Sequence, residues 1–207
     1  MAKVTGGIAQ GLSGKTGGVV FVQRDGQTYI RVVPVRSKSS WTPRQQLHRT
    51  RFKAVNNYCA IYKHTLIPQI WNLAAEHNYG YNLFLKTNMP AFALDGHLAD
   101  VEKLHFSAGK LPLPQHFKAK RSDNDPFKVE VSWVNDPNMK STRDSDQLLM
   151  IVGYMGHSTP PIAMGVKRSA GMAIIEIPSD QLNMTGIYLF FTSSTRDSYS
   201  PDQYFGV

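Results

Sequence analysis

The second half of this chain alternates between short apolar runs and clusters of turn residues, and this pattern limits the fold more than any other feature. The run at 127–133 alternates strictly, which places Phe127, Val129, Val131 and Trp133 on one face of a strand. About seven such short runs in roughly 105 residues predict an antiparallel β-sandwich of the immunoglobulin or fibronectin type. The other expected strands lie at 147–155, 161–167, 172–177, 187–192 and 199–205, with weaker candidates at 104–106 and 113–117.

Near the N-terminus, Asp25-Gly26 separates two β-branched runs at 19–22 and 29–33. This dipeptide is the strongest short-range signal for a two-residue β-hairpin turn of type I′. The turn predicts one apolar face, which we expect to be buried, and a second face that mixes polar and apolar side chains. The expected cross-strand pairs are Phe21 with Ile30, Val19 with Val32, Val22 with Tyr29 and Val20 with Arg31.

A helix is expected from Thr42 to about Lys63. Thr42 can cap its N-terminus, and Pro43 occupies the first helical position, where a missing N–H costs nothing. The first turns carry basic side chains on most faces, so the start of this helix should project past the core. The apolar stripe expected to reach the core consists of Phe52, Val55, Tyr58, Cys59 and Tyr62.

Two further helical segments are expected, one from Pro68 and a shorter one at 81–86. The predicted fold class is therefore α+β, in which an N-terminal β-hairpin and helices precede an immunoglobulin-like sandwich. We expect two domains, a basic hairpin-plus-helical module at 1–102 and the sandwich at 103–207.

The net charge of +8 is concentrated in the first third of the chain. Residues 1–64 hold eleven of the 23 Lys and Arg residues but a single one of the 15 acids, Asp25. Such asymmetry favours binding to a polyanion or to an acidic protein surface, although a solvated surface explains it equally well. The candidate partner-binding residues are Arg24, Tyr29, Arg31, Arg36, Lys38, Arg44, Arg49, Arg51 and Lys53.

Residues 9–16 satisfy a relaxed phosphate-loop pattern, A-x-x-x-x-G-K-T. A phosphate loop must open a helix whose N-terminus binds the phosphates, whereas here Gly17-Gly18 leads into a strand signal. The seven histidines and Cys59 show no metal-ligand spacing, and no serine lies in a nucleophile elbow. We therefore expect no enzymatic activity, no cofactor, no metal and no small-molecule substrate.

No apolar run approaches the roughly 18 residues that would span a bilayer, so no membrane partner is expected. The first seven residues lack the apolar core of a secretion signal. We expect synthesis in the cytoplasm, which is compatible with incorporation into a larger particle such as a virion.

The chain resembles, over nearly its whole length, an uncharacterised family of bacterial proteins, a domain of unknown function. Its G-K-x-G start at 14–17 and its Y-x-G ending at 204–206 are the distinctive motifs, and Pro201-Asp202 departs from the family's last loop. The resemblance implies the order of parts and no assigned activity. Other matching residues are Gly26, Arg31, Pro34, Thr42, Gln45, Arg49, Phe52, the run 168–171, Pro178, the run 188–191 and Ser193.

Two functions remain open. The first is a structural or assembly role, with a phage-derived virion as one setting, in which the basic module contacts another copy or another protein subunit. Acidic residues that could face it are Asp123, Asp125, Asp144 and Asp146. The alternative is nucleic-acid binding by the basic hairpin and helix, although no named nucleic-acid motif accompanies them.

Overall fold

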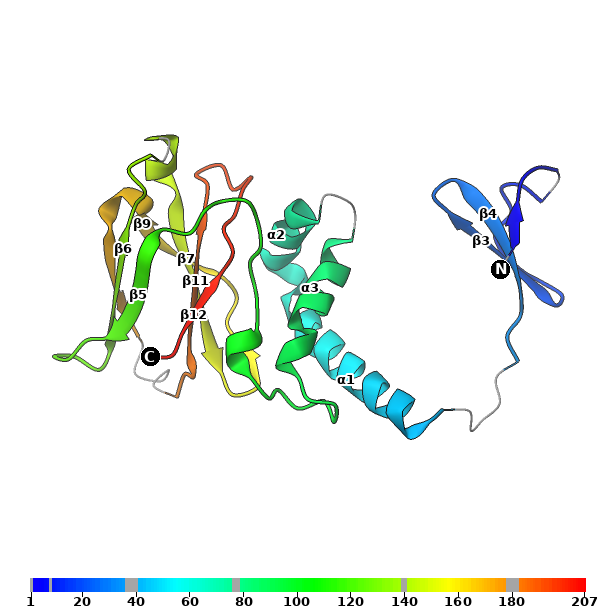
Figure 1. The fold of residues 1–207 in the computed structure, drawn as a ribbon, viewed down its shortest axis with the longest axis horizontal. Coiled ribbons are helices and arrows are strands. Elements are labelled where there is room, and N and C mark those ends of the chain that lie inside the picture. Colours follow the sequence, from blue (N-terminus) through cyan, green and yellow to red (C-terminus); the bar gives the residue numbers. More distant parts are fainter. Residues whose placement is uncertain (1, 8, 36–40, 76–78, 139–140, 178–182) are drawn as a thin grey trace. The chain divides into compact units, whose positions relative to one another are not determined.

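The computed structural model describes residues 2–7, 9–35, 41–75, 79–138, 141–177 and 183–207. Its internal contacts divide the chain into two compact units, Met1–Thr42 and Pro43–Val207 (Figure 1). This division differs from the expected boundary between residues 102 and 103. The physical reason is that the helices after Pro43 share a core with the strands that follow them.

The N-terminal unit contains a four-stranded antiparallel sheet with the strand order β1-β4-β3-β2. The expected hairpin is confirmed: Asp25 and Gly26 have φ angles of 53° and 72°, as a type I′ turn requires, and all four expected cross-strand pairs are present. The strands are β1 (Ala2–Val4), β2 (Gly14–Thr16), β3 (Val19–Arg24) and β4 (Gln27–Val32).

Strand β2 contains the phosphate-loop-like sequence. Lys15 pairs with Val20 of β3, and two turn residues, Gly17 and Gly18, connect the two strands. The prediction that a strand follows this sequence is confirmed. Lys15 therefore lies in a β-ladder, where no helix N-terminus is available to bind phosphate.

The apolar face of this sheet is not buried as expected. Val19, Phe21 and Ile30 are only half-buried, and Val32 is 76% exposed. Among the described residues of this unit only Thr28 is buried, and its Oγ1 accepts a hydrogen bond from the Gly11 N–H at 2.9 Å. A sheet of this size has too few residues to bury its own apolar face.

The C-terminal unit begins with helices. The expected helix start at Pro43 is confirmed, and residues 43–50 are all exposed, so the start of the helix projects past the core as expected. Phe52 was expected in the core but is 52% exposed, because burial along this helix begins at Val55. The helices are α1 (Pro43–Ala60), the 3-10 helix η1 (Ile61–His64), α2 (Ile67–Ala74) and α3 (Gly80–Asn88).

Two antiparallel sheets follow the helices. The first has three strands in the order β10-β6-β5, and the second has the order β12-β11-β7-β8, with β9 also paired to β7. Residues 104–106 form no strand, and β8 was not expected. The strands are β5 (Gln115–Arg121), β6 (Lys128–Val134), β7 (Gln147–Tyr154), β8 (His157–Ser158), β9 (Ile162–Lys167), β10 (Met172–Glu176), β11 (Gly186–Thr192) and β12 (Gln203–Phe205).

Strands β7 and β11 lie at the centre of this unit and are buried on both faces. One face, with Leu148, Met150 and Val152 of β7, shares a core with Val131 and Trp133 of the three-stranded sheet. The opposite face packs against the helices, so the unit has three layers: a small sheet, the central sheet and a helical layer (Figure 1). The residues of the central sheet that face the helices are Leu149, Ile151, Tyr188 and Phe190.

Polar contacts attach the helical layer to the rest of the unit. The Trp71 indole N–H of α2 donates to the Phe106 carbonyl at 3.0 Å. The Tyr62 hydroxyl of η1 donates to the Ser158 carbonyl of β8 at 3.2 Å. Both tie helices to segments distant in sequence, and both satisfy polar groups that burial would otherwise leave unpaired.

A buried ion pair lies at the edge of the core between the two sheets. Arg168 Nη1 is 3.7 Å from Asp146 Oδ2, and each side chain is 1% exposed. Burial raises the pKa of Asp146 and lowers that of Arg168, because it disfavours both charged forms. Asp146, suggested above as part of an acidic surface, is therefore unavailable to a partner.

We expect residues 43–207 to unfold cooperatively when expressed alone, and residues 103–207 to lack a cooperative transition. Removal of the helices would expose Leu149, Ile151, Tyr188 and Phe190, each worth about 1.5–3 kcal/mol of burial. Urea unfolding followed by circular dichroism measures this. A cooperative transition in the 103–207 fragment would contradict the three-layer description.

A second prediction concerns pH. His105 Nδ1 lies 3.4 Å from Asp202 Oδ1, and hydrogen bonding to this buried carboxylate raises the pKa of His105. The folded state thus holds the His105 proton more tightly than the unfolded state does. The contribution of the His105–Asp202 pair to stability is therefore complete below the pKa of His105 in the unfolded chain, about 6.5, and is lost as pH rises through its raised pKa in the folded protein.

The variant His105→Gln should therefore show a smaller decrease in melting temperature than the wild type between about pH 5.5 and about pH 8.5. His64→Gln, at an exposed position, is the control and should retain the wild-type decrease. An unchanged decrease in the His105 variant would show that this pair does not contribute.

Candidate binding surfaces

The expected partner-binding residues are distributed over both units. Arg36 and Lys38 lie outside the described residues. Arg24, Tyr29 and Arg31 lie on strands β3 and β4 of the N-terminal sheet. The remaining four, Arg44, Arg49, Arg51 and Lys53, lie within the first eleven residues of α1.

The register of the N-terminal sheet gathers its basic side chains on one face. Lys15 of β2 pairs with Val20, which pairs with Arg31. Lys3 of β1 pairs with Tyr29. Directly paired residues project from the same side of a sheet, as do residues two apart in a strand. All the Lys and Arg residues of these four strands therefore share one face, the cationic face, formed by Lys3, Lys15, Arg24 and Arg31 around Tyr29, Val20 and Val22.

The basic groups of the cationic face are open to solvent. Lys3, Lys15 and Arg31 are exposed, while Tyr29 is half-buried. Arg24 Nε lies 3.5 Å from Asp25 Oδ2 with both side chains about three-quarters exposed, an arrangement that contributes little to stability. Asp25 is also the single acid in residues 1–42, so the field over this face is positive.

Sequence reasoning missed Lys3 and Lys15 as members of this face. Lys3 belongs to a three-residue strand that pairs with β4, which is distant in sequence. A strand of that length carries no readable periodicity, and no hairpin turn connects it to its partner. Lys15 also belongs to a three-residue strand, but the Gly17-Gly18 turn connects β2 directly to β3. This dipeptide is a hairpin signal that could have placed Lys15 beside Val20.

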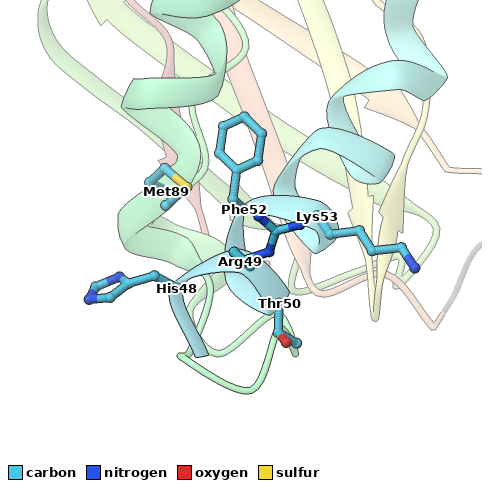
Figure 2. Close-up of a pocket in the computed structure, with 6 residues that line it drawn as sticks. All are labelled: His48, Arg49, Thr50, Phe52, Lys53 and Met89. Carbon is cyan, nitrogen blue, oxygen red and sulfur yellow. The ribbon is translucent and has the colours of Figure 1, made fainter. Parts of the chain in front are cut away.

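The second surface is an open groove of about 730 Å³ beside the middle of α1. Phe52 and Met89 supply its apolar lining, and in Figure 2 His48 and Lys53 extend away from it in opposite directions. Arg49 and Thr50 complete it. The groove thus combines an apolar surface with positive charge at its margins.

The basic residues at the start of α1 oppose the helix dipole. The first turn contains Arg44 and no acid, although the positive end of the dipole favours negative charge there. An anionic or acidic partner at this end would be favoured by both the dipole and the side chains.

Arg51 has a structural contact. Its Nε and Nη2 atoms both donate to the Met89 carbonyl, at 3.1 Å and 2.6 Å, and the side chain is half-buried. This bond attaches α1 to the 3-10 helix η2 (Met89–Ala91). The Arg51 guanidinium is thus committed within the fold.

Cys59 is 1% exposed, and burial raises the pKa of its thiol to about 12, which suits packing rather than nucleophilic attack. Among the described residues, no three His, Cys, Asp or Glu side chains are grouped so that they could hold a metal ion.

No protein-family model matches the chain, and no curated protein is found to be related to it. None of the helices in the described ranges is long and apolar enough to cross a membrane.

The different environments of Arg51 and Lys53 lead to a prediction. Arg51→Gln should lower the free energy of unfolding by about 1.5–3 kcal/mol, because it removes charged hydrogen bonds to the Met89 carbonyl. Lys53→Gln, two residues away and exposed, should change it by less than about 0.5 kcal/mol. Urea unfolding of both variants measures the difference. Equal effects would contradict the structural role of Arg51.

Proposed function

We propose that this protein is a non-enzymatic structural or assembly protein that acts through protein–protein contacts, with a second copy of the chain as its partner. One observation carries the proposal: the apolar face of the N-terminal sheet is left incompletely buried within its own unit. An apolar sheet face gains stability when another surface covers it.

The energetics of the N-terminal unit support this proposal. A unit of about 40 residues generally needs a disulfide, a metal or association to be stable. This unit contains no cysteine, and Thr28 is the one buried side chain among its described residues. The exposed edge of the apolar face, at Val32, is the part that association would bury.

The C-terminal unit is the scaffold in this proposal. We propose that its two sheets form an immunoglobulin-like β-sandwich, a reading supported by the core that the sheets share. Trp133 of the small sheet and Phe191 of the central sheet make an edge-to-face contact with ring centroids 5.5 Å apart. The helical layer on the outer face of the central sheet is an addition to such a sandwich.

A phage-derived particle is the biological setting of this proposal. A bacterial protein of this kind, derived from a phage and made in the cytoplasm, would be incorporated into a particle such as a virion. There the basic start of α1 would contact an acidic surface of a neighbouring subunit, for which Asp123 and Asp144, both exposed, are candidates.

We expect the full chain to form a defined oligomer at micromolar concentration and Val32→Lys to lower its mass, because a buried lysine in the contact is costly. Size-exclusion chromatography with light scattering measures both. Val134→Lys is the matched control: this valine also ends a strand, is 52% exposed and lies in the other unit, so the variant should keep the wild-type mass. A monomeric wild type would overturn the proposal, and so would an unchanged mass in Val32→Lys.

A further inference from the structure

We propose that the cationic face of the N-terminal sheet binds single-stranded nucleic acid. The site consists of Lys3, Lys15 and Arg31, which would contact phosphates, and Tyr29, on which a base would stack. This goes beyond the assembly role, because it uses the other face of the sheet.

The arrangement of charge across the sheet suits a nucleic-acid backbone. Lys3 and Lys15 lie on the two edge strands, β1 and β2, and Arg31 lies on β4 between them. Neighbouring strands are about 4.8 Å apart, so the two lysines define a span of about 14 Å. A strand of nucleic acid crossing the sheet would meet a cation at each edge and one in the middle.

The position of Tyr29 adds a contact that simple charge attraction does not provide. Tyr29 lies beside Lys3 on one side and Val22 on the other, and its hydroxyl donates to Gln27 Oε1 at 3.3 Å. An aromatic ring flanked by cations on an open sheet is the arrangement with which proteins stack unpaired bases. Duplex DNA offers no free base faces, which favours a single strand as the ligand.

The near absence of acidic side chains around the cationic face favours nucleic acid over a protein surface as its ligand. Asp25 is the single acid of residues 1–42, and it lies at the turn beside Arg24. Protein interfaces generally carry charges of both signs, whereas a repeating phosphate backbone is matched by positive charge alone. Charge complementarity therefore favours the phosphodiester chain.

The two proposals can be tested separately because side chains alternate along β4. Arg31 and Val32 are neighbours in sequence but project from opposite faces of the sheet. Val32→Lys should impair assembly and leave the cationic face intact, while substitutions at Lys15 and Arg31 should do the reverse.

The experiment is fluorescence anisotropy of the full chain with a labelled oligo-dT strand, and with a labelled duplex of equal length, over a range of salt concentrations. Three phosphate contacts on a single strand predict that log affinity falls with log salt with a slope of about 2. The single strand should bind more tightly than the duplex.

The test variant is the double change Lys15→Gln and Arg31→Gln, which should weaken binding and lower the slope by about 1.4. The matched control is Lys118→Gln with Lys167→Gln, which removes the same charge from exposed strand positions of the other unit and should preserve the slope. Tyr29→Leu should weaken binding about tenfold through lost stacking, and Tyr29→Phe should restore it.

Three outcomes would overturn the inference. The first is no oligo-dT binding at low salt. The second is an equal loss in the test and control double variants, which would indicate attraction by overall charge alone. The third is tighter binding to the duplex, with no effect of Tyr29→Leu. If Val32→Lys abolishes the oligomer while oligo-dT binding persists, the two functions are independent. If the wild-type chain is monomeric but binds oligo-dT, only the assembly proposal is lost.

Discussion

The C-terminal unit depends on the burial of the central strands β7 and β11 on both faces. Successive residues such as Leu148 and Leu149 enter different cores, one shared with the small sheet and one shared with the helices. Neither layer can be removed without exposing a full apolar face of the central sheet. This constraint explains why the helices belong to the same unit as the strands, although they precede them in the chain.

The same burial requires that polar groups inside the unit be paired. The Asp202 carboxylate accepts the backbone N–H groups of Phe106 and Ser107, and Trp133 donates its indole N–H to the Arg168 carbonyl. The Arg168 guanidinium also lies over the Phe191 ring, 4.9 Å from its centroid. These contacts join segments far apart in sequence, so they specify which layers meet as well as stabilising them.

The N-terminal unit differs from the C-terminal unit because its sheet has no buried apolar core among the described residues. Alternation along β3 and β4 sends apolar side chains to one face and cations to the other. The two faces of the sheet therefore differ in chemistry, one being apolar and the other cationic. The two proposed activities follow from this single alternation, which also keeps them physically separable.

Local signals in the sequence determined the elements whose partners are close in the chain. Asp25-Gly26 specified the hairpin and its register, Pro43 the start of α1, and the alternation at 127–133 the inward face of β6, because turn geometry and periodicity act over a few residues. Only the tertiary structure decided the rest. The placement of Lys3 beside Tyr29, the covering of β7 and β11 by helices, and the burial of Asp146 all depend on contacts between distant segments, which no local pattern encodes.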